Sequence, residues 1–278
     1  MLAIVLAVSA SLSWGLSDFA AGLVSRRLAA WTVVFWSQIV GIPPLLLLIT
    51  LVGSPVPPVT DVLWGALAGC LSGLGLSMLY WAMAMDMITV VAPVAALAPV
   101  IPVIVGVKRG DNFSTIHWVG VSAALIGVLL LSIQTNKGHI RAIPRWSLGL
   151  AALAALAFGC WFVFMQNATG NGYLWALVTQ RTASAALLGI VISAIRVDPR
   201  PRSKLVPALV AVGLLDLAGT AAFSVASHTG ALGVVSVLSS LYPLPSVVLA
   251  LMILKERLNL FQSTGVAFAL AAIGCLAS

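Results

Sequence analysis

The chain has 278 residues, of which 61% are hydrophobic and only 8% are charged. A soluble domain carries about 45–50% apolar and about 25% charged residues, so this composition excludes water as the main solvent. The formal net charge of +7 does not indicate nucleic-acid binding, because Lys and Arg lie in short loops and form no basic stripe. We therefore expect an integral membrane protein whose partner is the lipid bilayer, with no nucleic-acid partner.

Apolar segments recur along the whole chain, each long enough to cross about 30 Å of hydrocarbon. The first segment begins at Leu2 without a basic n-region or a processing site, so we expect a retained helix there. Breaks rich in Pro, Gly and charge separate the segments. In chain order, the hydropathy predicts ten transmembrane helices near 2–24, 31–52, 62–85, 87–107, 116–134, 147–168, 173–195, 205–228, 231–254 and 260–277.

The sequence also predicts an internal repeat. A shift of 144 residues places rare residue types on one another, and one inserted residue extends the match. The matches are Gly15 on Gly159, Trp31 on Trp175, Gly69 on Gly213, Gly75 on Gly219, Pro99 on Pro243, Asp111 on Glu256 and Gly120 on Gly265. Because each half has an odd number of helices, the halves enter the membrane in opposite senses. We expect an all-α integral membrane protein of two inverted five-helix repeats, 1–134 and 147–278, joined by a loop at 135–146.

Lys and Arg are distributed unevenly between the two sets of loops. Eleven of the 14 lie in the loops that follow the odd-numbered helices, whereas the alternate loops hold only Lys108 and Arg109. The positive-inside rule therefore places both termini outside the cytoplasm and the loop from Arg196 to Lys204 inside it.

Three charged side chains lie well inside predicted helices: Asp18, Arg181 and Asp216. Each costs roughly 2.5–3.5 kcal/mol at mid-helix, so we expect each to face a partner or a wet cavity. One hypothesis is that Arg181 and Asp216 form an ion pair that holds adjacent helices together. The other is that Arg181 meets an anionic substrate group while Asp18 or Asp216 binds a coupling proton or cation. Trp14, one turn before Asp18, either packs or lines the same cavity.

Proline is concentrated in the fourth and ninth predicted helices, at Pro93, Pro99, Pro102, Pro243 and Pro245. Proline removes a helix hydrogen bond and frees a carbonyl. Broken helices at corresponding positions of two repeats are typical of a substrate site at the membrane midplane, and simple kinking is the alternative.

Further amphipathic side chains are candidates for lining a pathway, with packing or interhelical hydrogen bonding as the alternative: Gln38, Tyr80, Trp81 and Tyr242. Gly65, Gly69 and Gly73 recur every four residues, which favours close helix contact within one chain or in a homodimer.

The residues argue against an enzyme. The chain has one Glu, its three His are far apart in sequence, and its three Cys have no CxxC spacing, so we expect no metal site, disulfide framework or cofactor. No P-loop motif is present, so ATP is not expected to drive any transport.

Several short motifs are spread over both halves. The second half carries Leu238 to Pro243, then Leu254 to Leu258, then Gln262 to Gly265, and the first half carries Trp14-Gly15, Tyr80-Trp81-Ala82, Ala92 to Val100 and Gly110 to Gly120. This arrangement resembles the EamA family of the drug/metabolite transporter superfamily. Asp111 stands where that family usually has Glu, and Lys255 where it usually has Gly.

The resemblance implies a secondary transporter of small organic metabolites, such as amino acids, related metabolites or drugs, that works by alternating access in the cell membrane. A channel or a non-transporting receptor or structural protein is the alternative. The family more often keeps both termini in the cytoplasm, which is the opposite of what the loop charge predicts.

Overall fold

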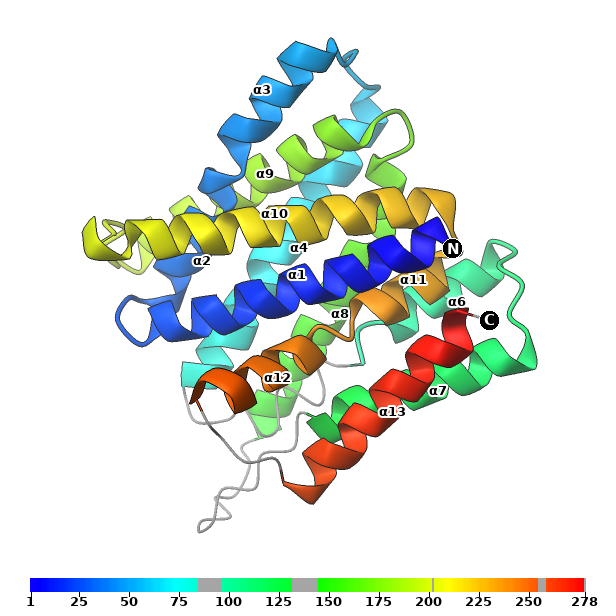
Figure 1. The fold of residues 1–278 in the computed structure, drawn as a ribbon. Coiled ribbons are helices and arrows are strands. Elements are labelled where there is room, and N and C mark those ends of the chain that lie inside the picture. Colours follow the sequence, from blue (N-terminus) through cyan, green and yellow to red (C-terminus); the bar gives the residue numbers. More distant parts are fainter. Residues whose placement is uncertain (85–96, 132–144, 202, 255–258, 278) are drawn as a thin grey trace.

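The structure is a computed structural model that describes residues 1–84, 97–131, 145–201, 203–254 and 259–277. Within these residues the regular elements are all helices (Figure 1). Both chain termini lie at the same end of the molecule, here called the terminal end. The opposite end, here called the basic end, holds the loops around Arg26-Arg27 and Arg196 to Lys204.

The first half contains six described helices. They are α1 (Leu2–Ser25), α2 (Ala30–Val40), α3 (Ile42–Val52), α4 (Val59–Ala84), α6 (Val100–Lys108) and α7 (Thr115–Leu131). The second half follows the same plan, with α8 (Arg145–Ala168), α9 (Tyr173–Ala194), a 3₁₀ turn (Ser203–Leu205), α10 (Val206–Thr229), α11 (Leu232–Ser239), α12 (Pro243–Leu254) and α13 (Leu260–Ala277). The start of α8 lies two residues before the predicted start of the second repeat.

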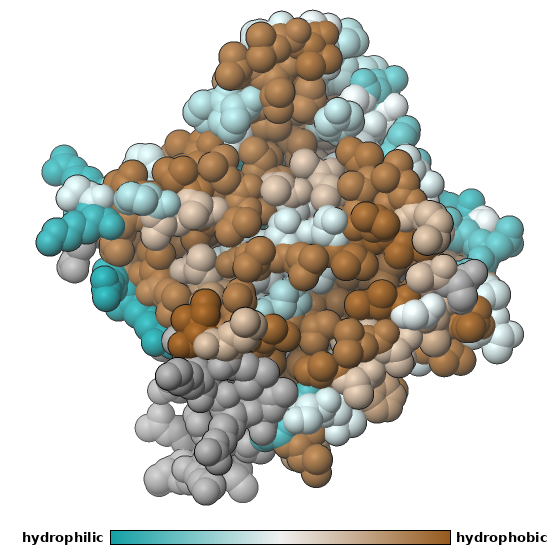
Figure 2. Space-filling model, in the orientation of Figure 1, coloured by the Kyte–Doolittle hydropathy of each residue, from teal (hydrophilic) through white to brown (hydrophobic). Residues whose placement is uncertain are grey.

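Seven described helical segments are long and apolar enough to cross a membrane: Leu2–Ser25, Ala30–Val52, Val59–Met78, Tyr173–Ala194, Ser203–Thr229, Leu232–Leu249 and Leu260–Ala277. Two shorter apolar helical segments, Thr115–Leu131 and Ala152–Ala168, accompany them. Figure 2 shows hydrophobic residues over most of the visible face, with hydrophilic ones gathered toward its edges, where the helices end. Such a surface suits a bilayer, because lipid tails favour apolar side chains on the outside.

One predicted helix is interrupted at a position where hydropathy predicted no break. The segment 31–52 is divided at Gly41 into α2 and α3, which point in different directions (Figure 1). Pro43 and Pro44 lack the N–H groups that would bond to the carbonyls of the preceding turn. The second helix therefore starts afresh beyond Gly41.

The ninth predicted helix is also divided. Residues 240–242 form a turn between α11 and α12, and Pro243 is the first residue of α12. In the first half, α6 begins directly after Pro99, and Pro102 lies in its first turn. Pro93 lies outside the described residues.

The two halves pack against each other with repeated contacts. A Cβ atom on Gly15 of α1 would lie 2.6 Å from the carbonyl oxygen of Tyr242, and one on Gly159 of α8 would lie 2.7 Å from that of Ala98. Gly15 and Gly159 are 144 residues apart in the chain, and so are Ala98 and Tyr242. Only glycine therefore allows α1 and α8 to approach the start of α12 and α6 so closely.

The last helices of the two halves, α7 and α13, run side by side (Figure 1). Gly120 of α7 faces Leu276, and Gly265 of α13 faces Leu131, so this contact repeats as well, at the shift of 145 residues. Gly65, Gly69 and Gly73 of α4 face α9, which places the small-residue stripe inside the chain.

Candidate functional site

A cavity lies at the centre of the described helices, between α1, α4, α8 and α10 and next to the turns that precede α6 and α12. About 820 Å³ of space inside it, part of which is open to the outside, is not filled by protein atoms. Its lining residues are Trp14, Asp18, Ser72, Leu76, Ala98, Pro99, Val128, Phe158, Trp161, Phe162, Gln180, Asp216, Thr220, Ser240 and Tyr242.

The lining follows the internal repeat. Five pairs of lining residues are separated by 144 positions: Trp14 and Phe158, Asp18 and Phe162, Ser72 and Asp216, Leu76 and Thr220, and Ala98 and Tyr242. Residues related by the repeat thus meet around one space. The cavity therefore lies where the two halves face each other.

One wall of the cavity is aromatic. Trp14 packs against Trp161 with ring centroids 5.6 Å apart, and Phe162 and Phe223 complete a cluster in which the ring centroids lie 5.0 to 6.3 Å apart. These spacings and the tilted and edge-on arrangements are those that aromatic pairs favour. Nε1 of Trp161 is buried and has no hydrogen-bond partner. The wall thus combines a rigid ring surface with one unused donor.

Two carboxylates reach the cavity, Asp18 from α1 and Asp216 from α10. Both also line a smaller cavity of about 280 Å³ between α1, α2 and α10, which continues along α1 to Ala21. Among the described residues, no hydrogen bond or ion pair involves the side chain of Asp18. The two carboxylates therefore stand where the two cavities meet, and only one of them has a cationic partner.

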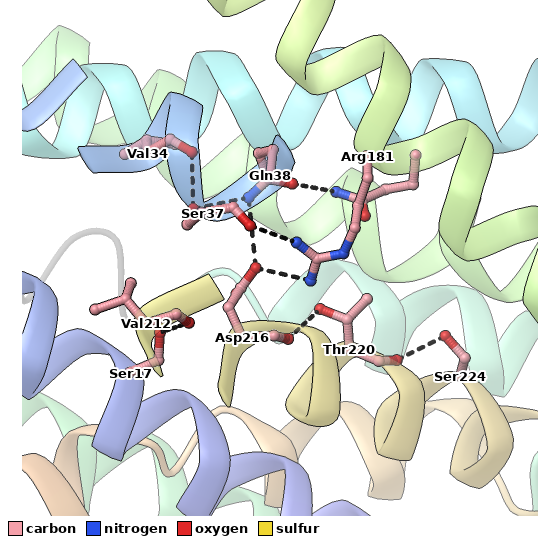
Figure 3. Close-up of polar contacts among 10 residues, drawn as sticks. Ser17, Val34, Ser37, Gln38, Arg181, Val212, Asp216, Thr220 and Ser224 are labelled. Carbon is pink, nitrogen blue, oxygen red and sulfur yellow. Dashed lines mark hydrogen bonds and ion pairs between the residues drawn. The ribbon is translucent and has the colours of Figure 1, made fainter. Parts of the chain in front are cut away.

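That partner is Arg181 of α9, whose polar contacts are drawn in Figure 3. Arg181 is completely buried. Its Nη2 donates to Oδ2 of Asp216 at 3.0 Å, and its Nη1 donates to the carbonyl oxygen of Ser37 at 3.2 Å. Gln38 Nε2 also donates to Oδ2 of Asp216, at 3.4 Å, and Gln180 Nε2 donates to Oε1 of Gln38 at 3.5 Å. The ion pair that the sequence suggested between these helices is present.

The break between α2 and α3 makes room for this arginine. A Cβ atom on Gly41 would lie 2.8 Å from both Cδ and Nε of Arg181. Any larger residue at this position would push the guanidinium out of place. Arg181 itself does not line the central cavity. Its partner Asp216 and its neighbour Gln180 do line it.

The predicted site residues are thus placed in three groups. Trp14, Asp18, Asp216, Tyr242 and Pro99 line the central cavity. Gln38 and Arg181 form the polar network beside it, whereas Pro102, Pro243 and Pro245 belong to α6 and α12 and do not line it. The side chains of Tyr80 and Trp81 lie outside the described residues.

Several lining residues are not among the predicted site residues, chiefly Phe158, Trp161, Phe162, Gln180 and Thr220. The repeat itself carried a signal for some of them. Adding 144 to Trp14 and Asp18 gives Phe158 and Phe162, both of which line the cavity.

Polar contacts join the two halves at both ends of the molecule. At the terminal end, Arg109 donates to Gln166 at 2.8 Å and to Asn167 at 3.0 Å. At the basic end, Nε1 of Trp36 donates to the carbonyl oxygen of Pro199 at 2.6 Å, and Thr32 donates to that of Asp198 at 3.2 Å. The central cavity lies between these two sets of contacts.

Comparison with known proteins agrees with this architecture. The solved structures that the chain is similar to include a crystal structure of a protein that matches with a TM-score of 0.81 at 17% sequence identity, over 98% of this chain and 95% of that one. It matches no curated protein sequence. The sequence profile of the EamA-like transporter family matches twice, at residues 1–133 and 145–278, which are the two halves described above. The chain is therefore a multi-pass integral membrane protein that belongs to the EamA-like transporter family.

Proposed function

We propose that this protein is a secondary carrier of the cell membrane that moves small organic metabolites by alternating access. In this proposal the chain crosses the membrane ten times, counting α2 with α3 and α11 with α12 as single crossings. The two five-helix halves rock against each other about the central cavity, which is open to one side of the membrane at a time.

The observation that carries the proposal is the cavity lined by residue pairs from both repeats. A site at the interface of two inverted repeats keeps similar surroundings when the halves exchange conformations. The contacts of Arg109 at one end and of Trp36 at the other cross the same interface. Such contacts can break and form in turn, which is what alternate opening of the two ends requires.

The absence of a P-loop motif from the sequence supports a carrier driven by an ion gradient or by exchange. The carrier proposal therefore predicts saturable flux that needs no nucleotide. It also predicts counterflow, in which unlabelled substrate on one side accelerates the movement of labelled substrate from the other.

The substrate can be sought by comparing metabolites in cells that lack the protein with those in cells that overproduce it. Compounds that change are then tested for flux in proteoliposomes, with and without a pH gradient. Saturable flux with counterflow supports the carrier. Single-channel conductance without saturation would show a channel instead, and compounds that bind without crossing would show a receptor.

A further inference from the structure

We propose that the central cavity binds a small protonated organic amine with an apolar or aromatic body, held between the Asp18 carboxylate and the aromatic wall. The binding site stands on the structure alone. That the amine is cargo rests on the function proposed above.

The charges around the cavity leave one negative charge without a partner. Asp216 is bound by Arg181, which is itself fully buried, and this pair is neutral as a whole. Asp18 has no cation beside it among the described residues. A carboxylate inside a membrane helix calls for a partner, and a cationic ligand would supply one.

The neutral polar groups around the cavity favour a ligand with N–H donors. Oε1 of Gln180, whose side chain is 2% exposed, is buried and accepts no hydrogen bond. The hydroxyl hydrogens of Thr220 and Ser240 are already donated to the carbonyl oxygens of Asp216 and Val237. Together with Asp18, these oxygens are acceptors that an ammonium group with its N–H donors would satisfy.

The aromatic wall favours an organic cation over a bare metal ion. The faces of Trp14 and Trp161 attract cations, and the same rings pack against an apolar body. Nε1 of Trp161, buried without a partner, could donate to an acceptor on the ligand. An inorganic ion would leave this surface without a role.

An anionic ligand does not fit the cavity. Within the described part of the chain, the guanidinium near the cavity is that of Arg181, which is held by Asp216 and by the Ser37 carbonyl and does not line the cavity. A carboxylate in the cavity would face Asp18 and Asp216 and repel both. We therefore replace the hypothesis that Arg181 meets an anionic substrate group with the proposal that the cavity prefers a cationic ligand.

Three compounds with the same phenyl body test the charge preference: phenethylamine, 2-phenylethanol and phenylacetate. Binding to the purified protein is measured by isothermal titration calorimetry in detergent at neutral pH. We expect phenethylamine to bind at least tenfold more tightly than the alcohol, and phenylacetate not to bind. Equal binding of the amine and the alcohol, or tighter binding of phenylacetate, would overturn the proposal.

The role of Asp18 is tested with Asp18→Asn. Losing one member of a buried charge pair is expected to weaken phenethylamine binding on the order of 30-fold or more. The matched control is Asp61→Asn, since Asp61 is also buried but accepts hydrogen bonds from Asn171 at the terminal end, away from the cavity. The control should bind the amine like the wild type. Unchanged affinity in a folded Asp18→Asn protein would rule out this site.

The aromatic wall is tested in the same assay with Trp14→Leu, for which Trp118→Leu is the control because Trp118 is 46% exposed and does not line the cavity. Only Trp14→Leu should weaken amine binding, by about fivefold or more for a desolvated cation–π contact. Binding of sodium ions that depends on Asp18, with no binding of the amine, would identify a coupling-ion site instead.

Flux measurements in proteoliposomes separate this proposal from the function it rests on. Amine binding without amine flux would leave the site in place and contradict the carrier. Saturable flux of other metabolites in a protein that does not bind amines would support the carrier and reject the amine site.

Discussion

Arg181, Asp216 and Asp18 are charged side chains in the middle of long apolar helices, and their contacts differ. Arg181 is fully buried and makes two hydrogen bonds, yet its Nε has no partner. Asp216 accepts from Arg181 and Gln38 and still reaches the cavity. A buried ion pair gains little over an apolar pair of the same size, but removing one partner leaves a charge that is costly to bury.

Arg181→Met and Asp216→Asn should therefore each lower the melting temperature in detergent. Removing one partner of a buried pair lowers the free energy of unfolding by about 3–5 kcal/mol. The double variant should lose less than the two single variants together. The control is Arg109→Met, because Arg109 makes its two hydrogen bonds at an exposed position. Strictly additive losses in the double variant would show that the pair is not coupled.

Gly219 and Gly75, related by the repeat, each face an aromatic lining residue. A Cβ atom on Gly219 would lie 2.6 Å from the ring of Trp14, and one on Gly75 would lie 3.1 Å from the ring of Phe158. Overpacking a well-packed interior costs about 1–3 kcal/mol. Gly219→Ala should therefore lower the melting temperature and the substrate affinity more than Gly75→Ala does, and the reverse order would contradict the packing described here.

At the level of helices, the start of α11 depends on a residue from the other half. Oδ2 of Asp111, in the loop between α6 and α7, accepts a hydrogen bond at 3.3 Å from the backbone N–H of Gly233. Gly233 is the second residue of α11, where backbone N–H groups lack partners within the helix. A carboxylate at this end of a helix is also favoured by the helix dipole.

Asp111→Ala should lower the free energy of unfolding by about 1 kcal/mol, as expected for loss of a helix cap. Thermal unfolding in detergent measures this loss. Asp198→Ala is the control, because Asp198 bonds to the N–H of Arg200 in an exposed loop and caps no helix. Equal effects of the two substitutions would argue against a cap.

The helices themselves could largely be predicted from the sequence, since loops rich in charge, Gly or Pro end the apolar segments. The predicted segment 260–277 coincides with α13, and 173–195 with α9 (Tyr173–Ala194). The break at Gly41 was missed because the residues around it are as apolar as the rest of the segment, and a hydropathy window averages over a single interruption.

The cavity lining could be predicted only in part. Asp18, Asp216 and Trp14 stand out because charge and indole groups are costly or distinctive within a membrane. Phe158, Phe162 and Leu76 do not stand out, because a helix that is apolar all round gives no periodic signal of the face it buries. The repeat relates Phe158 and Phe162 to Trp14 and Asp18, whereas the position of Leu76 follows only from the way in which the two repeats pack.

At the scale of the whole molecule, the charge of the loops and the orientation usual in the family predict opposite orientations of the chain in the membrane. One labelling experiment separates the two. If the positive-inside rule holds, a cysteine at Ser203, at the basic end, faces the cytoplasm. In a background without Cys70, Cys160 and Cys275, Ser203→Cys should resist an impermeant thiol reagent added to intact cells.

Val56→Cys is the matched control, because Val56 is 78% exposed in the loop between α3 and α4 at the terminal end. This cysteine should react with the reagent from outside. The reverse pattern, with Ser203→Cys labelled and Val56→Cys protected, would place both termini in the cytoplasm.

The five pairs of cavity residues related by the repeat contain no pair of identical residues. An assembly of two identical five-helix chains would have to present every charged group near its axis twice, so its charges would come in even numbers. A single chain with two diverged halves is free of that restriction. It can set a carboxylate at Asp18 opposite a phenyl ring at Phe162, and so offer one unmatched charge to a ligand that carries one.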